Sequence, residues 1–196
     1  MDPAGRDEQP INNRLRTLLQ THLRQLEPEL LRPDPGAVLI EQGGIADSLL
    51  LVQRGRLAID IHRNGHPSRT IAEVGAGAVL GEMALFGAGE TRHGARVRVL
   101  DAGTEILRFS REALHGAVLF DAELAAEMLL VGSERCRNSN RMINLLLDGI
   151  DAMAGGDAST LTGICNALRN GPDSMVQAAA QLEQLLTLAA PPRPES

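Results

Sequence analysis

The chain has 196 residues, of which 43% are hydrophobic and 22% are charged, as in a globular protein with a working core. The formal net charge is −6, and every basic residue is an arginine. An acidic chain is a poor general binder of phosphate backbones or anionic membranes. Because only 2% of the residues are aromatic, a ligand must be held by hydrogen bonds, charge and aliphatic contacts rather than by stacking.

The sequence gives no sign of membrane insertion or export. No segment approaches about 18 uninterrupted apolar residues, and the acidic, proline-containing start is unlike a signal peptide. The two cysteines, Cys136 and Cys165, fit no metal or redox spacing, and we interpret both as packed helix residues. We therefore expect a cytoplasmic protein in a reducing compartment, with no membrane partner.

Residues 1–10 are polar and are expected to be flexible. From Ile11 onward, leucines recur at helical spacing, and this pattern ends near Pro28. The leucines that define this predicted helix are Leu15, Leu18, Leu19, Leu23 and Leu26.

From residue 33 to 109 the pattern changes to short apolar runs separated by Gly, Pro, Asp and Asn. Between Arg56 and Ile61, apolar and polar residues alternate, which is typical of a strand with one buried face. Many short strands at close spacing predict a sandwich, a jelly roll or a small barrel. The predicted strands are Val38–Ile40, Leu49–Val52, Leu57–Ile61, Arg69–Val74 and Thr104–Phe109.

Helical character returns at Ser110, a candidate N-cap. Residues 122–147 contain no proline and a single glycine, Gly132, so we predict one long helix there.

Beyond a break at Gly155 and Gly156, two amphipathic stretches at 159–169 and 173–188 precede a proline-rich end. We predict a helical hairpin over residues 157–189 that serves dimerisation or docking of a partner, and a flexible end at 190–196.

The segment with the most distinctive chemistry is Val79–Ala95, a glycine-punctuated turn with a basic residue near its end. Backbone N–H groups at the start of a short helix can cradle an anion, and the Arg92 guanidinium could bind the same phosphate. Glu82 could accept hydrogen bonds from a sugar hydroxyl. These features suggest a sugar-phosphate pocket; the alternative is a buried turn with Arg92 as a solvated loop cation.

This segment resembles the phosphate-binding cassette of the cyclic nucleotide-binding domain family, which opens Gly-Glu-apolar-Ala-Leu and has an arginine about ten residues after the glutamate. Residues 31–43 and 47–59 are similar to the first strands of that family. The resemblance covers residues 12–147, and it implies an α+β fold: a double-stranded β-helix, or jelly-roll-like β-roll, flanked by helices. We therefore place this domain at residues 11–147.

The resemblance also implies how a ligand is bound. Gly81 and the backbone amides of Met83 and Ala84 would meet the cyclic phosphate. Glu82 would take the ribose 2′-hydroxyl, and Arg92 would bind the phosphate.

The long helix would close over the base, with Ser133 near it if the helix aligns as in the bacterial catabolite activator. The same helix would pair two subunits as a homodimer. The family is not catalytic by itself, so the resemblance implies a cyclic nucleotide, with cyclic AMP expected, as ligand rather than as substrate or catalytic cofactor.

The residue order after Arg92 departs from the family pattern. Counting from Gly81 places Arg92 where the arginine of the family can fall. Counting back from the next strand, where Val97 and Val99 must face the core, places His93 there instead. Either Arg92 reaches the phosphate from a loop with one extra residue, or His93 is a weaker, pH-dependent substitute.

A metal site and an enzymatic nucleophile are not expected. His62, His66, His93 and Glu82 could suggest a metal-binding β-roll, but the His-x-His spacing of such sites is missing. No Ser, Cys or Asp lies in a recognisable nucleophile motif. We therefore expect neither a metal nor catalytic residues.

After Asp148 the chain has two basic residues and five acidic ones, whereas a DNA-reading helix needs several Arg, Lys, Asn or Gln on one face. Nucleic acid is therefore not an expected partner. The basic residues are Arg169 and Arg193, and the acidic ones are Asp151, Asp157, Asp173, Glu183 and Glu195.

These observations lead to one main interpretation and two alternatives. The main one is a non-catalytic cyclic nucleotide sensor whose ligand moves the C-terminal helices and so regulates a protein partner. The first alternative is a dimeric structural or adaptor protein with a vestigial cassette. The second is a transcription regulator similar to the catabolite activator.

Overall fold

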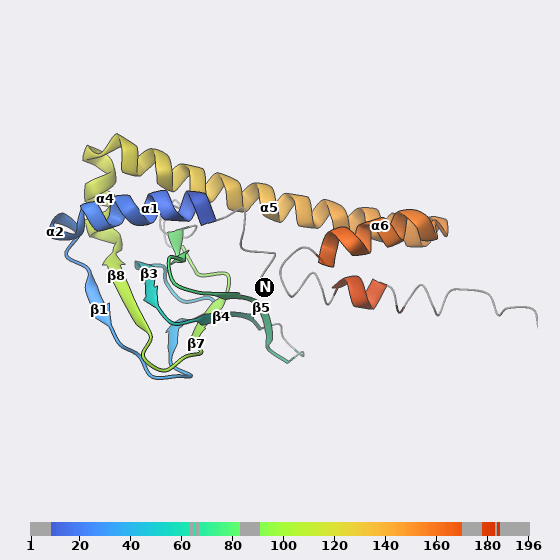
Figure 1. Cartoon of the computed structure of the whole chain (residues 1–196), viewed down its shortest axis with the longest axis horizontal. Coiled ribbons are helices and arrows are strands. Elements are labelled where there is room, and N and C mark those ends of the chain that lie inside the picture. Colours follow the sequence, from blue (N-terminus) through green and yellow to red (C-terminus); the bar gives the residue numbers. More distant parts are fainter. Residues whose placement is uncertain are drawn as a thin grey trace, which may run out of the picture. The chain divides into compact units, whose positions relative to one another are not determined.

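The computed structural model describes residues 9–62, 65, 67–82, 91–169, 178–182 and 184, with side chains from residue 13 onward. Helices stand at both ends of the chain and strands between them (Figure 1). The helices are α1 (Gln9–Thr21), α2 (Leu23–Leu26), α4 (Arg111–Phe120), α5 (Ala122–Gly155) and α6 (Ala158–Arg169). The strands are β1 (Glu29–Leu31), β2 (Val38–Ile40), β3 (Ser48–Arg54), β4 (Leu57–Ile61), β5 (Arg69–Val74), β6 (Val79–Leu80), β7 (Arg96–Val99) and β8 (Glu105–Ser110).

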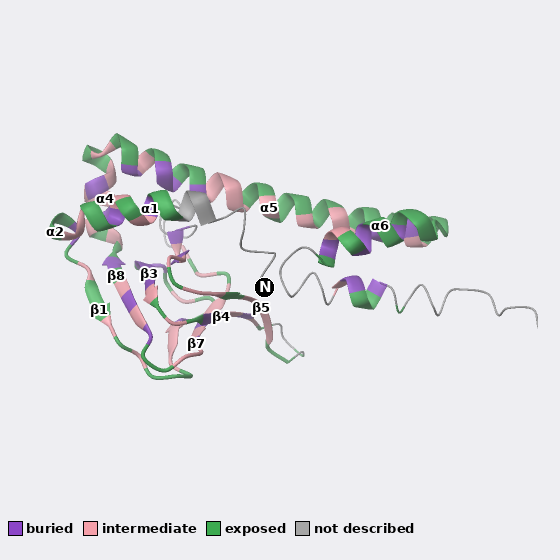
Figure 2. Cartoon of the chain, viewed as in Figure 1, coloured by how far each residue is buried: buried purple, intermediate pink, exposed green. Residues whose placement is uncertain are grey.

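The strands form two four-stranded sheets, with antiparallel pairing between neighbours. One sheet has the order β1-β8-β3-β6 and the other β2-β7-β4-β5. Buried side chains of both sheets form one apolar cluster, so the two sheets close on each other as a roll (Figure 2). The predicted α+β fold, a β-roll flanked by helices, is confirmed.

Strand β3 is buried on both of its faces. Leu50 and Val52 belong to the cluster between the sheets, whereas Leu49 and Leu51 belong to the cluster that includes the helices. All four side chains are at most 2% exposed. A strand covered on both faces has no polar side to show, which explains why this run is continuously apolar rather than alternating.

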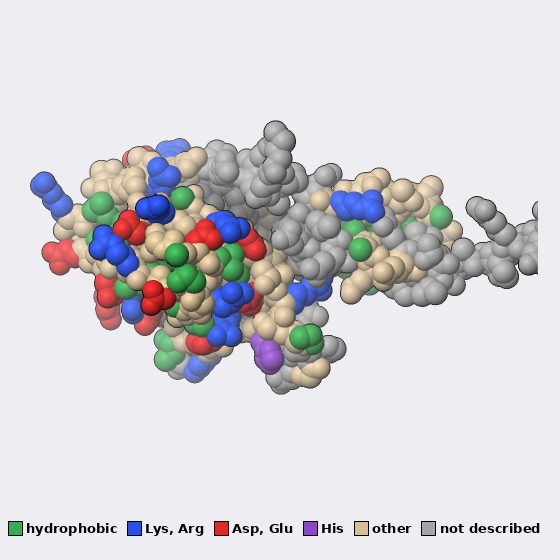
Figure 3. Space-filling view, turned by 60° about the horizontal axis from the view of Figure 1, so that its bottom comes forward, with side chains coloured by type: hydrophobic (Ala, Val, Ile, Leu, Met, Phe, Trp, Pro, Cys, Tyr) green, Lys and Arg blue, Asp and Glu red, His purple; other side chains and the backbone are tan. Residues whose placement is uncertain are grey.

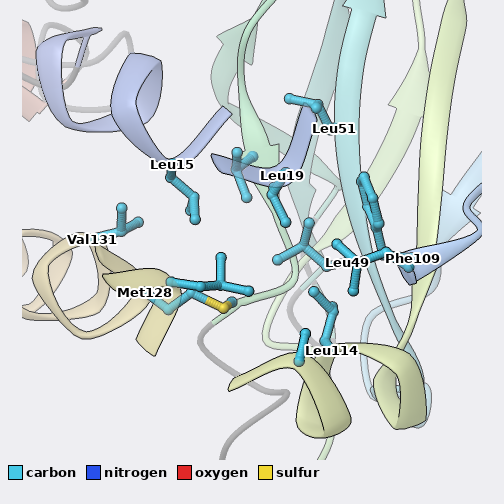
Figure 4. Packing of buried hydrophobic residues seen from close by; sticks show 12 residues of the cluster. Leu15, Leu19, Leu49, Leu51, Phe109, Leu114, Met128 and Val131 are labelled. Atoms are coloured by element: carbon cyan, nitrogen blue, oxygen red, sulfur yellow. The ribbon is translucent and has the colours of Figure 1, made fainter. Parts of the chain in front are cut away.

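Helices cover the outer face of the sheet that contains β3. Figure 4 shows side chains of α1, β3, β8, α4 and α5 meeting in this cluster. Full burial of one such side chain is worth about 1.5–3 kcal/mol, so the contacts fix the first turns of α5 against the roll. The residues labelled there are Leu15, Leu19, Leu49, Leu51, Phe109, Leu114, Met128 and Val131.

The helix boundaries partly match the prediction. The Ser110 side chain accepts a hydrogen bond from the Ala113 N–H at 3.2 Å, so the predicted N-cap of α4 is confirmed. Helix α1 begins at Gln9, ahead of the predicted start at Ile11. The helical segment ends in a left-handed turn at Glu27 (φ 39°), directly before Pro28 as predicted.

Helix α5 is longer than predicted: it continues past Leu147 and ends at Gly155. Its last turns are held by apolar packing rather than by local propensity: Ala152 joins a buried cluster with α6 residues. Gly156, with φ +68°, then provides the left-handed residue that ends the helix. The buried members of this cluster are Ala152, Leu161, Ile164, Cys165, Leu168, Ala179 and Leu182.

The remaining predictions concern the chain ends and the cysteines. Helix α6 matches the predicted stretch 159–169, and residues 178–182 and 184 of the stretch 173–188 are helical. Residues 1–8, 170–177, 183 and 185–196 lie outside the described residues. Cys165 is buried as predicted, but Cys136 is exposed on α5, so the interpretation of Cys136 as a packed residue was wrong.

The chain divides into two compact units, Gly5–Arg135 and Cys136–Ser196 with Met1–Ala4, and the division falls within α5. The predicted domain limits at residues 147 and 157 stay a prediction. No helix among the described residues is long and apolar enough to span a membrane.

Candidate functional site

Gly81 begins the site, at the point where β6 ends. Its φ is +94°, and a Cβ atom there would lie 2.7 Å from the Ser48 carbonyl oxygen of β3. An L side chain would be strained by the backbone angle and would also clash with the neighbouring strand. Only glycine therefore lets the chain leave β6 in this direction and bring the next residue into the roll.

Glu82, the next residue, is a buried acid with a partner from a distant helix. It is 4% exposed, and its Oε1 atom pairs with Nη1 of Arg135 on α5. The other guanidinium nitrogen, Nη2, donates to the Val79 carbonyl at 2.6 Å. Arg135 thus holds the end of β6 and the first residue of the cassette together.

The second oxygen of Glu82, Oε2, is buried and has no hydrogen-bond partner among the described residues. A carboxylate oxygen can only accept hydrogen bonds. A buried acceptor without a donor is costly, and it suits a ligand hydroxyl that would supply the missing hydrogen bond.

The packing of α5 determines where Arg135 points. Leu124, Met128, Val131 and Arg135 follow one another at spacings of four, three and four residues, so they share one face of the helix. The first three are buried in the cluster with α1 and β3. The same face therefore carries the Arg135 guanidinium into the roll one turn later.

An ion pair between α1 and α5 supports this arrangement. Arg14 Nε lies 2.7 Å from Oε1 of Glu127, whose side chain is 4% exposed. Sequence reasoning missed Arg135. The available signal was a charged residue in register with an apolar helix stripe, a pattern that predicts a buried ion pair.

His93 and Arg92 are adjacent residues ahead of β7, and their side chains have different surroundings. His93 is fixed by two backbone hydrogen bonds: its N–H donates to the Gly44 carbonyl at 2.9 Å, and its carbonyl accepts from the Gly43 N–H at 2.7 Å. Its ring lies beside Gly81, with Cε1 3.7 Å from the position of a Cβ atom there. Arg92 is exposed, and its Nη1 donates to the Gly43 carbonyl at 2.8 Å.

The strand phase used in the sequence analysis agrees with this placement. Val97 and Val99 are buried at 4% and 0% exposure, whereas Arg96 and Arg98 are partly exposed. Counting back from Val97 gave His93 the inner position, and the structure places its ring beside Gly81 although residues 94 and 95 form a bend ahead of β7.

Burial lowers the pKa of His93 from its ordinary value, while the negative charges of Asp47 and Glu82 act in the opposite direction. His93 therefore lies close enough to the cassette for a charge on its ring to matter there.

The structure brings Gly81, Glu82, His93 and Arg135 together. Met83 and Ala84 lie outside the described residues. Ser133 precedes Arg135 by two positions and is therefore about 200° away around α5, on the opposite side of the helix. Among the described residues no group of three or more His, Cys, Asp or Glu could hold a metal ion.

The site thus combines a glycine turn, a buried acid and cationic side chains at one end of a β-roll. Residues 31–119 match the family model of the cyclic nucleotide-binding domain, and this part of the chain is therefore similar to that family. The resemblance found in the sequence is confirmed.

Three relatives illustrate the similarity. The cyclic AMP receptor protein of Thermus thermophilus is 29% identical over 185 residues, spanning 76% of this chain and 84% of the relative. The solved catabolite activator protein of Thermus thermophilus has a TM-score of 0.57 at 18% identity, covering 87% of this chain and 95% of that chain. A transcriptional regulator of Thermotoga maritima has a TM-score of 0.57 at 19% identity, covering 64% and 94%. At these identities the two structures show the fold alone.

The comparisons do not support the expectation that nucleic acid is no partner, because several similar structures are transcriptional regulators. The surface of the roll does not decide the question. Figure 3 shows arginine side chains interspersed with Asp and Glu on the face in view. Among the ion pairs of the roll, Arg56 pairs with Asp101 and Glu73, so part of the arginine charge of the roll is neutralised.

Proposed function

We propose that this chain is a non-catalytic sensor of a cyclic nucleotide, with cyclic AMP as the ligand to test first. The observation that supports the proposal most directly is Glu82, a buried carboxylate with one oxygen on Arg135 and the other without a donor among the described residues. A ribose hydroxyl is a donor of the right kind for that oxygen. Backbone amides after Gly81 and a cation from the Arg92–His93 segment would take the phosphate.

The same ion pair suggests how binding is transmitted. Arg135 belongs to α5, and its partner Glu82 belongs to the cassette, so a ligand that binds Glu82 acts directly on a group that holds the helix. A ligand shifts a conformational equilibrium only as far as it binds one state better than the other. We infer that occupation of Glu82 changes the position or order of α5 and thereby acts on a protein partner of the C-terminal helices.

We also propose that the chain acts as a homodimer through α5. One stripe along this helix follows alternating steps of four and three residues, the repeat of a coiled-coil seam, and is largely exposed in the single chain. Leu129, Ile143, Leu147 and Ile150 are 53–72% exposed on it. The stripe comprises Ala122, Ala126, Leu129, Ser133, Cys136, Asn140, Ile143, Leu147 and Ile150.

A second copy of the chain is the occupant that fits this seam. A heptad stripe finds the same geometry on an identical helix, and a polar Asn at a seam position specifies register in parallel dimers. Ser133 lies on this stripe, so in such a dimer it would face the other subunit.

The decisive experiment is isothermal titration with cyclic AMP, cyclic GMP and cyclic di-GMP, with 2′-deoxy-cyclic AMP as the matched control ligand. If Glu82 reads the 2′-hydroxyl, the deoxy ligand binds at least about tenfold more weakly, because a buried acceptor stays unpaired. The Glu82→Gln variant should lose most of this discrimination. Cyclic nucleotide recovered intact after incubation would agree with a non-catalytic role.

Absence of binding to all three ligands would overturn the sensor proposal and leave the adaptor with a vestigial cassette. Equal binding of cyclic AMP and its deoxy form would remove Glu82 from the ribose site while leaving a sensor. The second candidate function, transcription regulation, is favoured by the similar regulators. It requires salt-dependent binding of duplex DNA by the full chain. The cytoplasmic location stays a prediction.

A further inference from the structure

We infer that His93 couples ligand binding to proton uptake, so that the site binds an anionic ligand more tightly as the pH falls. The inference rests on the proposed function, since it concerns the same pocket. It depends on three features of the described chain: where the His93 ring lies, which charged groups face the ring, and how an imidazole differs chemically from a guanidinium.

The first feature is position. The His93 backbone is fixed to Gly43 and Gly44 by hydrogen bonds of 2.7 and 2.9 Å, so the residue cannot turn over without breaking both. Its Cε1 atom lies beside Gly81, the glycine that opens the cassette. Under the proposed function the phosphate meets Gly81, and a phosphate at Gly81 would be near this ring.

The second feature is the set of charges around the ring. Asp47, in the loop before β3, and Glu82, after β6, both act on His93. Each already has a cation: Arg108 Nη2 lies 3.6 Å from Asp47, and Arg135 pairs with Glu82. Arg92, on the neighbouring position, donates to the Gly43 carbonyl. Neither acid is therefore an unopposed counterion that would keep the ring charged without ligand.

The third feature is chemical. A guanidinium is cationic at every accessible pH, whereas the partly buried imidazole of His93 can exchange its proton with solvent. In the empty site, burial favours the neutral ring. An anionic phosphate beside the ring favours the protonated form, so binding and protonation promote each other.

Thermodynamic linkage between proton binding and ligand binding determines the sign and the size of the pH dependence of the affinity. One proton taken up per ligand makes the affinity fall by as much as about tenfold for each unit of rising pH, between the pKa of the empty site and that of the occupied site. The cyclic phosphodiester stays a monoanion between pH 6 and 8. The pH dependence in this range must therefore come from the protein.

The test is titration of the full chain with cyclic AMP at pH 6.0, 7.0 and 8.0, each in two buffers of different ionisation enthalpy. The buffer dependence of the heat counts the protons taken up. We expect a net uptake that approaches one proton where His93 titrates. His93→Arg should bind with little pH dependence and more tightly than wild type at pH 8.0, and His93→Gln more weakly at pH 6.0 with little pH dependence. The matched histidine control is His62→Gln, an exposed residue outside the site, which should keep the wild-type pH profile.

Saturable binding without proton uptake, or a pH profile unchanged in both His93 variants, would overturn this inference and leave the sensor proposal intact. Lack of binding by wild type and by His93→Arg at all three pH values would overturn both. The two failures are thus distinguishable in one set of titrations.

Discussion

Arg135 of α5 and Glu82 of the cassette form an ion pair across 53 positions of sequence, and both side chains are mostly withdrawn from water. Helix position and pocket chemistry are therefore parts of one interaction. Removal of either partner affects the stability of the roll as well as its ability to bind.

Replacement of Arg135 by Ala should destabilise the chain by about 3–5 kcal/mol, because Glu82 is left buried without its cation. Urea unfolding followed by circular dichroism measures the change. The double variant Arg135→Ala with Glu82→Gln should recover part of the loss, since it removes the uncompensated charge. Arg141→Ala, an exposed change on the same helix, is the control and should stay within about 0.5 kcal/mol. Equal midpoints for Arg135→Ala and this control would contradict a stabilising ion pair.

Gly81→Ala should destabilise the fold by about 2–5 kcal/mol. The new methyl group would sit 2.7 Å from the Ser48 carbonyl oxygen at a backbone φ of +94°. Gly116→Ala in α4 is the matched control, because no atom lies within 4 Å of the added Cβ and alanine favours a helix interior. That control should be neutral or slightly stabilising. A loss of unfolding free energy well below this range for Gly81→Ala would mean that the turn after β6 relaxes to accept the methyl group.

Much of the β-roll was predictable from short-range patterns. The strand at Leu57–Ile61 and the buried phase of Val97 and Val99 are local properties, and both are present in the structure. The expected single buried face of Leu57–Ile61 was wrong, because Ala58 and Asp60 are buried while Ile59 and Ile61 are partly exposed, with an irregular register between Ile59 and Asp60. Counting back from β7 also put His93 where the arginine of the family falls, and its ring lies beside Gly81 in the structure. The phase of β7 follows from one requirement, that Arg96 and Arg98 stay out of the core.

Features that depend on long-range packing were not predictable. The apolar stripe of α5 indicates that Arg135 is partly buried, but it does not reveal its partner Glu82, which lies more than fifty positions away. The end of α5 was placed too early for a similar reason. Gly149 weakens a helix by propensity, yet here its missing side chain allows close packing, since a Cβ would lie 3.3 Å from Leu182.

The stability of α6 should depend on pH through its cap at Asp157. Hydrogen bonds from the Thr160 hydroxyl and amide, and from Ser159, lower the pKa of this carboxyl from 3.8 to about 2. A depressed pKa stabilises the folded state fully above the unfolded value near 3.8, and this contribution is lost as the pH falls through about 2.

Thermal unfolding at 222 nm between pH 5 and pH 2 tests the cap. Asp157→Asn keeps an acceptor at the N-cap but cannot titrate, and Asp157→Ala removes the acceptor. The Tm advantage of wild type over Asp157→Asn should shrink as the pH falls through this range. An advantage that is constant with pH would show that the carboxylate charge contributes nothing to α6.

The exposed stripe of α5 predicts that Ile143→Asp separates two subunits. Burial of one isoleucine is worth about 2 kcal/mol, so the loss of two across a symmetric seam should weaken association by about a thousandfold. Sedimentation equilibrium measures the dissociation constant. Asn144→Asp, also exposed but beside the stripe, is the matched control and should leave the dimer intact.

Cys136 tests the orientation of the same seam without any substitution. In a parallel, in-register pair of helices the two Cys136 residues lie opposite each other, within reach of a disulfide. Copper phenanthroline, which accepts the two electrons released by the thiols, should therefore yield a covalent dimer that Cys136→Ser abolishes. Cys165 is buried and should not substitute for it. A dimer that is not cross-linked would mean that the two subunits meet through another face of α5, or that their α5 helices run antiparallel. A chain that stays monomeric at all concentrations would contradict the seam itself.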